Sequence, residues 1–463
     1  MIDSTQQQLR FPPVSGLSVR ADFDGDTLSS DFGPLLLQGV DRQTGLSKRL
    51  AGAIRDSRHA SYVEHSMPDL LTQRIYQIAC GYEDGNDANT LRHDPMFKLG
   101  VGRPPLDEDN ALASAPTLSR MEHAVNSRDL YRMAQAFLQG FIDSYASPPP
   151  VIVLDMDHSD DPTHGQQAFS FYNHHYGHYC YLPLFVFEGI SGKFITAVLR
   201  PGKTPSGAEN AMIMKRVINA LRCAWPETHF ILRGDGHFSN PELMQLCLDD
   251  PHCDFIFGVS GNAVLNRMAA PHLDQVRQTH ERRRQYAQRA RLATPSRART
   301  YHELDYRAGS WPAGAFRLIL KAEVMECGDN RRYVVTSLDL PSPESVYRDL
   351  YAARGQDENY IKAIKLDLAS GRTSCTTFEA NQLRLYLACG AYVLHHEWRT
   401  QVLCHTELAK AQPMTVILKL FKLAVKVVQY KDRVKLRLPS NYPFKDLMHK
   451  ITERLFLARP APG

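Results

Sequence analysis

No apolar run in this chain of 463 residues reaches the ~18 residues expected of a membrane-spanning helix. The N-terminal stretch lacks a basic start followed by an apolar segment, so we expect no secretory signal and no membrane partner. The nine cysteines form no CxxC pair, and their odd number and irregular spacing favour reduced thiols in a cytosol.

A large excess of charge of one sign is also missing, because the net charge is only +4. Any nucleic-acid-binding surface must therefore be local. Charged residues make up 22% and hydrophobic residues 43% of the chain, as is typical of a folded soluble protein. The length predicts several domains and a substantial core, and we find no internal repeat.

One stretch combines a strand pattern with carboxylates. Residues 151–154 are apolar, follow three prolines and predict a buried strand that ends at Asp155 and Asp157. Side chains two apart on a strand share a face, so both carboxylates can point the same way. A divalent cation would compensate their burial, since such cations prefer oxygen ligands. The alternative is that both aspartates only cap the strand end.

The residues before this strand predict a mostly helical domain. Apolar residues at helical spacing occur at 41–55, 67–82 and 127–145, whereas 84–105 is rich in Asp, Gly, Asn and Pro and predicts a loop. Such a domain could bind DNA through one helix or could simply support the rest of the chain. Both interpretations stay open.

The order of segments after the strand indicates the fold class. Extended runs at 168–172, 179–187 and 194–199 precede a helix at 209–225, a strand at 229–233, a helix at 241–248 and a strand at 255–259. Antiparallel strands followed by a helical crossover to a parallel strand define the ribonuclease H-like order. The strand ending at Asp235 would then lie beside the one ending at Asp157. Ligands collect at the carboxyl ends of such strands, so Asp235 is a candidate second metal ligand, with a simple Asp-Gly turn as the alternative.

A nearby histidine run is a weaker signal. His174, His175 and His178 fall in a strand-and-turn segment, where their spacing does not predict a zinc site. We interpret them as polar loop residues.

An insertion then interrupts the sheet pattern. Residues 277–299 hold eight arginines, no lysine and a single acid, and small β strands follow at 316–324 and 332–337. Guanidinium binds phosphate in a bidentate manner, so Arg282, Arg283 and Arg284 are candidate DNA contacts. The alternative is a solvated helix face.

The helix predicted at 347–370 carries the third carboxylate. Tyr351, Arg354 and Glu358 are spaced three and four residues apart, and Lys365 lies two turns further on the same side. One helix thus offers a carboxylate flanked by basic and hydroxyl groups, which suits a metal ligand beside phosphate-binding groups. An isolated surface ladder is the alternative.

The chain resembles bacterial insertion-sequence transposases of the DDE superfamily, in the group with a Tyr-Arg-Glu-Lys signature. The signature positions match in full, and the segments around the first two carboxylates match at 153–167 and 231–238. The resemblance covers about Val151 to Lys426. It implies a ribonuclease H-like core with a β-rich insertion, and Mg²⁺ or Mn²⁺, as two ions, held by Asp157, Asp235 and Glu358. The first-motif pattern maps best on Asp157, with Asp155 as the alternative ligand.

The resemblance also implies a reaction and its partners. Arg354 and Lys365 would hold phosphates, and Tyr351 would hydrogen-bond to a DNA strand. The expected partner is double-stranded DNA, as terminal inverted repeats and target, bound by a homodimer. The expected reaction is metal-dependent DNA cleavage and strand transfer. Alternatives are a nuclease without strand transfer, or a catalytically inert DNA-binding regulator derived from a transposase.

The C-terminal segment is basic. Residues 414–463 hold eleven lysines or arginines against three acids, and 427–438 alternates apolar and basic residues. A strand with one basic face would follow a DNA backbone, and the alternative is packing against the core. The expected domain limits are 1–147 for the helical domain, 148–262 and 342–412 for the two parts of the core, 263–341 for the insertion and 413–463 for the tail.

Overall fold

The computed structural model describes residues 9–457, which form two compact units of a mixed α/β protein. One unit, called unit 1, contains residues 9–43, 58–119 and 397–457. The other, unit 2, contains residues 44–57 and 120–396. The domain limits expected from the sequence stay predictions.

Unit 1 joins both ends of the described chain. Strand β15 (Val425–Gln429) pairs antiparallel with β16 (Val434–Arg437) on one side and with β3 (Leu28–Ser29) on the other. A separate hairpin consists of β1 (Leu9–Val14) and β2 (Leu17–Ala21). The basic C-terminal segment therefore contributes strands to a sheet that also contains N-terminal residues.

Short helices make up the rest of unit 1. They are α1 (Gly33–Thr44), η1 (Ala60–Tyr62), α3 (Met67–Ala79), η2 (Gly85–Asp87), α4 (Ala88–Leu91), α5 (Pro95–Val101), η7 (Trp398–Val402), α14 (Pro413–Val416), η8 (Ile417–Phe421), α15 (Lys445–Thr452) and η9 (Glu453–Leu457). Helix α6 (Ala115–Ala124) crosses the limit between the units.

Capping residues and a glycine explain which of the helix predictions in this region are confirmed and which are wrong. The helix expected at 67–82 is confirmed, and the Ser66 hydroxyl caps its first turn. The prediction of a loop at 84–105 is wrong, because this segment contains α5. The Asp94 carboxylate caps the start of that helix by accepting hydrogen bonds from two backbone N–H groups. The single helix expected at 41–55 is divided by Gly45, whose φ of 65° favours glycine.

Unit 2 is built on an eight-stranded mixed sheet in the order β12–β13–β14–β11–β10–β4–β8–β9. Its strands are β4 (Val151–His158), β8 (Leu184–Glu188), β9 (Phe194–Val198), β10 (His229–Gly234), β11 (Cys253–Val259), β12 (Arg297–Leu304), β13 (Arg317–Met325) and β14 (Gly328–Thr336). Strands β4, β10 and β11 are parallel, and the other neighbouring pairs are antiparallel. The expected adjacency of the strands that end near Asp157 and Asp235 is therefore confirmed.

Helices and a small sheet complete unit 2. The helices are α2 (Leu46–Ala53), α7 (Ser127–Asp143), α8 (Gly207–Ala224), η3 (Gly236–Phe238), α9 (Pro241–Leu248), α10 (Ala263–Arg289) and α13 (Phe378–Glu397). The small sheet contains β5 (Asp161–Pro162), β6 (Phe171–Asn173) and β7 (His178–Tyr181). Both α7 and α8 begin with a capping box, at Asn126 and at Ser206, so their starts follow directly from local sequence.

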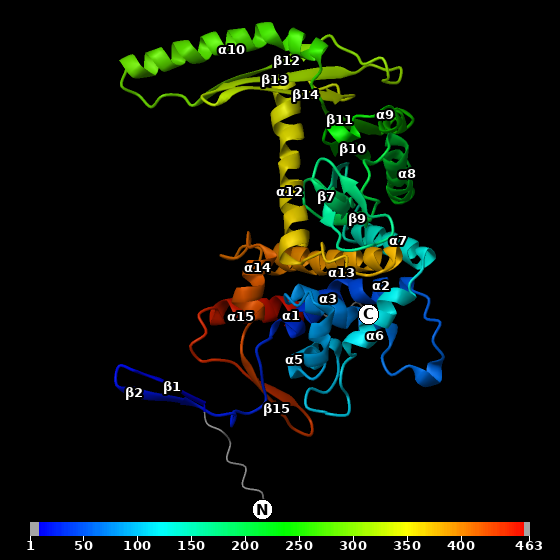
Figure 1. Cartoon of the computed structure of the whole chain (residues 1–463), viewed down its shortest axis with the longest axis vertical. Coiled ribbons are helices and arrows are strands. Elements are labelled where there is room, and N and C mark those ends of the chain that lie inside the picture. Colours follow the sequence, from blue (N-terminus) through cyan, green and yellow to red (C-terminus); the bar gives the residue numbers. More distant parts are fainter. Residues whose placement is uncertain (1–8, 458–463) are drawn as a thin grey trace, which may run out of the picture. The chain divides into compact units, whose positions relative to one another are not determined.

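The insertion does not stand apart from the sheet. Strand β14 pairs antiparallel with β11, so β12, β13 and β14 extend the same sheet at one edge. Helix α10 lies along β12 and β13 (Figure 1), with Leu265, Leu273 and Val276 among its buried residues. The expected interruption of the sheet is thus only an interruption in sequence.

The segment predicted as the glutamate helix is one continuous helical rod in Figure 1. It comprises α11 (Pro343–Ser345), η4 (Val346–Tyr351), η5 (Ala352–Arg354), α12 (Gly355–Lys362) and η6 (Ala363–Asp367). We call it the glutamate rod. Both η4 and η6 are π-helical. This form is rare in proteins overall, and where it occurs it is often at a functional site.

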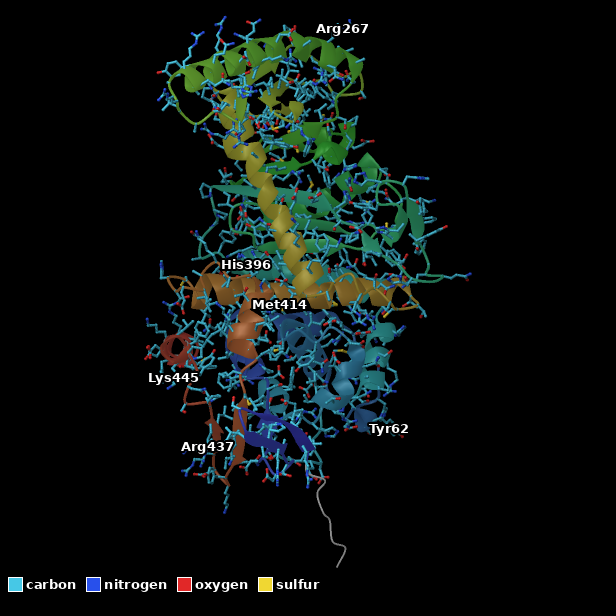
Figure 2. All side chains as sticks on the ribbon, turned by 60° about the vertical axis from the view of Figure 1, so that its left-hand side comes forward. Tyr62, Arg267, His396, Met414, Arg437 and Lys445 are labelled. Atoms are coloured by element: carbon cyan, nitrogen blue, oxygen red, sulfur yellow. The ribbon has the colours of Figure 1, made fainter. Side chains whose placement is uncertain are left out.

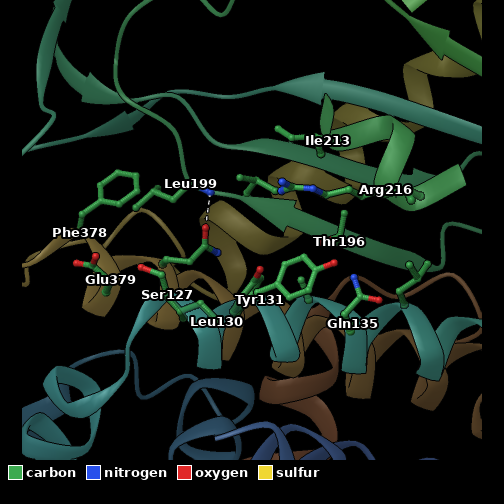
Figure 3. A pocket seen from close by; sticks show the side chains of 16 residues that line it. Ser127, Leu130, Tyr131, Gln135, Thr196, Leu199, Ile213, Arg216, Phe378 and Glu379 are labelled. Atoms are coloured by element: carbon green, nitrogen blue, oxygen red, sulfur yellow. Dashed lines mark hydrogen bonds between the residues drawn. The ribbon is translucent and has the colours of Figure 1, made fainter. Parts of the chain in front are cut away.

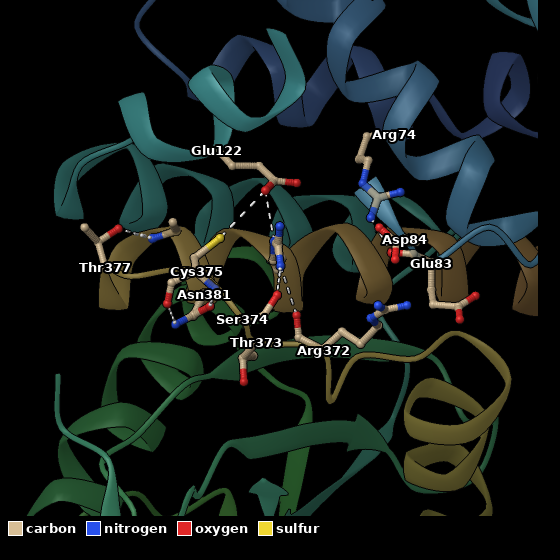
Figure 4. A network of polar contacts seen from close by, with 12 residues as sticks. Arg74, Glu83, Asp84, Glu122, Arg372, Thr373, Ser374, Cys375, Thr377 and Asn381 are labelled. Carbon is tan, nitrogen blue, oxygen red and sulfur yellow. Dashed lines mark hydrogen bonds and ion pairs between the residues drawn. The ribbon is translucent and has the colours of Figure 1, made fainter. Parts of the chain in front are cut away.

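The loop after the glutamate rod is fixed by a buried carboxylate. Glu122, 2% exposed, accepts a hydrogen bond from Arg384 Nε at 2.9 Å and a weaker one from Cys375 Sγ at 3.8 Å. Arg384 Nη1 also donates to Ser374 Oγ at 2.6 Å. Figure 4 shows Glu122 above Ser374 and Cys375 in this network. The rod and α13 are thereby joined by an ordered connection.

Within residues 9–457, no helix is both long and apolar enough to cross a bilayer. All nine cysteines lie in this range and are free thiols, as expected.

Candidate active site

The three expected carboxylates come from the ends of two neighbouring strands and from the glutamate rod. Asp157 lies near the end of β4, Asp235 follows β10, and Glu358 lies on α12 with an exposed side chain. Strands β4 and β10 are parallel and hydrogen-bonded, so their carboxyl ends meet at one edge of the sheet. Two of the candidates are therefore adjacent because of the sheet topology alone.

Asp157 is a buried carboxylate whose pKa responds to the charges of Asp235 and Glu358. Burial raises the pKa of Asp157, and the charges of Asp235 and Glu358 raise it further. Arg354 opposes them through an ion pair of 3.1 Å between its Nη1 and Asp157 Oδ2, and the resulting pKa is about 6. Asp157 therefore lies where negative charge accumulates and where a cation would be favourable.

Asp235 is stabilised differently. Its burial tends to raise the pKa, but hydrogen bonds from His237 and the positive charge of that ring lower it below the usual range. The carboxylate accepts the His237 backbone N–H at 2.9 Å and lies 3.0 Å from His237 Nδ1. Asp235 is thus a charged carboxylate at neutral pH.

Among the residues that the structure describes, no three His, Cys, Asp or Glu side chains form a group able to hold a metal ion. The chemistry of the donor set nevertheless fits a hard divalent cation, because it is entirely carboxylate oxygen. Burial is the main cause of the raised pKa of Asp157, and a bound cation would favour its charged form.

Three signature residues of the glutamate rod contact the strand ends. Arg354 is paired with Asp157, and Lys365 Nζ donates to Ser159 Oγ at 2.9 Å and to Asp160 Oδ1 at 2.7 Å. The Tyr351 hydroxyl lies so close to Gly258 that a Cβ there would come within 2.6 Å of it. Glu358, four residues after Arg354 on the same rod, is exposed.

Asp155 has a different environment from Asp157. It is fully buried, and both carboxylate oxygens accept hydrogen bonds from the guanidinium of Arg233. Asp357, next to Glu358, is also fully buried; burial and the neighbouring Asp155 carboxylate raise its pKa far above the usual range. Asp155 thus belongs to an interior cluster.

Sequence reasoning missed Arg233, Asp357, His237 and the role of His158. The ring of His158 stacks on Phe238 with centroids 4.9 Å apart, and burial lowers its pKa to about 3, so the ring is neutral. A charged residue inside the apolar strand 229–234 was the one available signal, and it pointed to Arg233.

The other predicted residues lie elsewhere in unit 2. His174 and His175 are exposed, and His178 Nε2 lies 3.1 Å from Asp160 Oδ2. Next to Asp160, the Asp161 carboxyl is 2% exposed, and burial raises its pKa to about 7.

Arg282, Arg283 and Arg284 lie on α10, the first two exposed and the third half-buried. The side chains on the outer face of α10 project away from the strands that it covers, as Figure 2 shows. Within the described part of the chain, none of the three has an ion-pair partner, whereas Arg277 pairs with Asp274 and Asp329.

A cavity of about 280 Å³ lies apart from the carboxylates. Its walls come from α7, α8, β9 and α13 and are mainly apolar, with Arg216 and Glu379 among the lining residues (Figure 3). The Gln382 side chain in its wall accepts the Leu199 N–H at 2.6 Å.

A comparison with known protein families identifies the family of this chain. Residues 11–460 match the family described as transposase DDE domain group 1. The chain therefore belongs to the DDE transposases, a family whose members act in DNA transposition and generally use divalent metals.

Among solved structures, the chain is similar to the piggyBac transposase in its synaptic complex with hairpin DNA. The identity is 12%, the alignment covers 93% of this chain and 87% of the other, and the TM-score is 0.43. No curated protein matches the chain. The family assignment rests on the sequence match.

Proposed function

We propose that this protein is an insertion-sequence transposase that cleaves DNA at the ends of its element and transfers the strand to a target. Asp157, Asp235 and Glu358 are the proposed catalytic carboxylates. The observation that carries the proposal is the position of Asp157 and Asp235 at the carboxyl ends of two parallel, hydrogen-bonded strands, with Arg354 of the glutamate rod paired to Asp157, in a member of a DDE family.

The proposed catalytic core is ribonuclease H-like. The strand order β9–β8–β4–β10–β11 supports it, with antiparallel neighbours on one side of β4 and parallel neighbours on the other. Helix α8 makes the crossover from β9 to β10, as that order requires. The insertion then extends the sheet beyond β11.

Two Mg²⁺ or Mn²⁺ ions are the proposed cofactors, held by Asp157, Asp235 and Glu358. When bound, such ions stabilise charge on the attacking and leaving oxygens of phosphoryl transfer. Asp157 would bind the ions in its charged carboxylate form. Arg354, which is paired with this carboxylate, would then have to release it or share it with the ions. The released guanidinium is then available to a DNA phosphate.

Lys365 and Tyr351 have related proposed roles. Lys365, now bound to Asp160 and Ser159, would fix the β4 end or bind a phosphate beside it. The Tyr351 hydroxyl would donate to a DNA strand near Asp235. The exposed arginines of α10 would bind the DNA backbone, and a homodimer on double-stranded DNA is the proposed assembly.

The test uses DNA that carries the sequences flanking the gene, with the parent protein and Asp235→Asn in Mg²⁺ or Mn²⁺. We expect the parent to nick the element ends and join them to a second duplex, and the variant to do neither while still binding. Cleavage without joining would establish the nuclease alternative. Binding without cleavage by the parent would establish the inert regulator.

A further inference from the structure

Each proposed metal ligand has a buried neighbour one or two residues earlier in the chain. Asp155 precedes Asp157, Arg233 precedes Asp235, and Asp357 precedes Glu358. The three buried residues are 0%, 2% and 0% exposed. Charged side chains are rarely buried so completely unless they are paired, so their grouping needs an explanation.

Arg233 is the centre of this group. Its Nε and Nη2 donate to the two oxygens of Asp155, and its Nη1 donates to the Leu350 carbonyl of the glutamate rod. Nη2 also donates to the Gly189 carbonyl at 3.3 Å, in the turn after β8. One guanidinium therefore links β4, β10, the β8–β9 turn and the rod. We call these residues, with Asp357, the Arg233 hub.

The Arg233 hub is closely packed around Gly189. A Cβ at Gly189 would overlap both the Asp155 carboxylate and Arg233 Nη2. Asp357 lies beside Asp155, so the rod approaches the hub through a side chain as well as through the Leu350 carbonyl.

We propose that Arg233 is a positioning residue that sets the spacing of Asp157, Asp235 and Glu358 through this hub. The inference rests on the proposed function. It gives Asp155 a supporting role in place of the alternative role of metal ligand. A planar guanidinium that binds a carboxylate in a bidentate manner has a defined orientation, and it fixes the elements that it joins. Outer contacts of this kind typically change metal affinity or activity about 10- to 100-fold when removed.

The experiment compares Arg233→Met and Arg233→Lys with the control Arg222→Met. Arg222 lies on α8 and is also well bonded, to Asp250 Oδ2 at 2.8 Å and to the Thr228 carbonyl at 2.7 Å. Thr228 precedes β10, so this contact is at the end of the strand away from Asp235. Each folded variant is assayed for DNA affinity, for the maximal cleavage rate at saturating DNA, and for the metal concentration that gives half that rate.

We expect the Arg233 variants to bind DNA with nearly the parent affinity. Their maximal cleavage rate should fall about 10- to 100-fold, or their half-saturating metal concentration should rise by that factor. The effect should be smaller in Arg233→Lys than in Arg233→Met. Arg222→Met should leave both quantities near the parent values. A parent-like rate and metal dependence in Arg233→Met would overturn the inference.

A second variant keeps the inference testable if the Arg233 substitution prevents folding. If Arg233→Met does not fold, Gly189→Ala perturbs the same hub by steric overlap and keeps every charge. Its maximal rate should also fall at unchanged DNA affinity, and a parent-like rate would overturn the inference. Absence of cleavage by the parent would instead refute the proposed function, so the two failures are distinguishable.

Discussion

Replacing Arg282, Arg283 and Arg284 with alanine removes three positive charges from α10 without touching the proposed active site. Two of these side chains are exposed and the third is half-buried, and no ion-pair partner occurs among the described residues. If they contact DNA phosphates, binding releases condensed counterions, and the affinity falls with salt by a slope of about 0.9 per contact on logarithmic axes.

The expected change is a salt slope lower by about one to three units, with weaker cleavage that is restored by raising the DNA concentration. Melting temperature should barely change, because exposed charges contribute little to folding. The assay is DNA affinity over a series of KCl concentrations.

Arg277→Ala is the matched control on the same helix. Its guanidinium is already paired with Asp274 at 2.5 Å and Asp329 at 2.6 Å, so it should affect the slope less than the triple variant does. An unchanged slope in the triple variant would mean that these arginines only face solvent. A large loss of melting temperature would mean that they pair with acidic residues of the protein.

Three further predictions concern single residues. Asp157→Ala should abolish metal-dependent cleavage in a protein that still melts like the parent, whereas Asp155→Ala should lower the melting temperature sharply; the reverse pattern would contradict the ligand assignment. Gly258→Ala should slow cleavage, because its Cβ would come within 2.6 Å of the Tyr351 hydroxyl and within 3.0 Å of the Gly236 backbone nitrogen next to Asp235, and a parent-like rate would exclude a role for this close packing. Burial raises the pKa of Asp161 from 3.8 to about 7, so its stabilising contribution is fully present below pH 3.8 and is lost as pH rises towards 7. Urea unfolding at pH 5 and pH 8 should show that the parent loses about 2–3 kcal/mol more stability over this range than Asp161→Asn does. An equal pH dependence in the two proteins would refute this prediction.

Much of the sheet followed from local sequence. The apolar run before Asp155 predicted β4, and the alternation of strands and helices predicted that β10 lies beside it. Apolar residues at helical spacing likewise predicted helix α3. These features depend on residues close together in the chain, which sequence patterns describe well.

Contacts between residues that are distant in the chain could not be predicted from the sequence. The pairing of β11 with β14, which brings the insertion into the main sheet, leaves no signal in either strand alone. The Arg233 hub joins four segments, and only the charge of Arg233 within an apolar strand hinted at it. Asp155 and Asp157 look alike in sequence because only three-dimensional packing decides which of them Arg233 binds.

The cleavage activity of Glu358→Gln tests the central claim most directly, with Glu344→Gln as the control. Glu344 is an exposed carboxylate at the start of the same glutamate rod, where it pairs with Arg348 at 2.7 Å. Removing the Glu358 carboxylate should abolish Mg²⁺- or Mn²⁺-dependent cleavage while DNA affinity stays near the parent value, and the control should cleave normally. Cleavage by Glu358→Gln at a rate close to the parent would contradict the assignment of the active site.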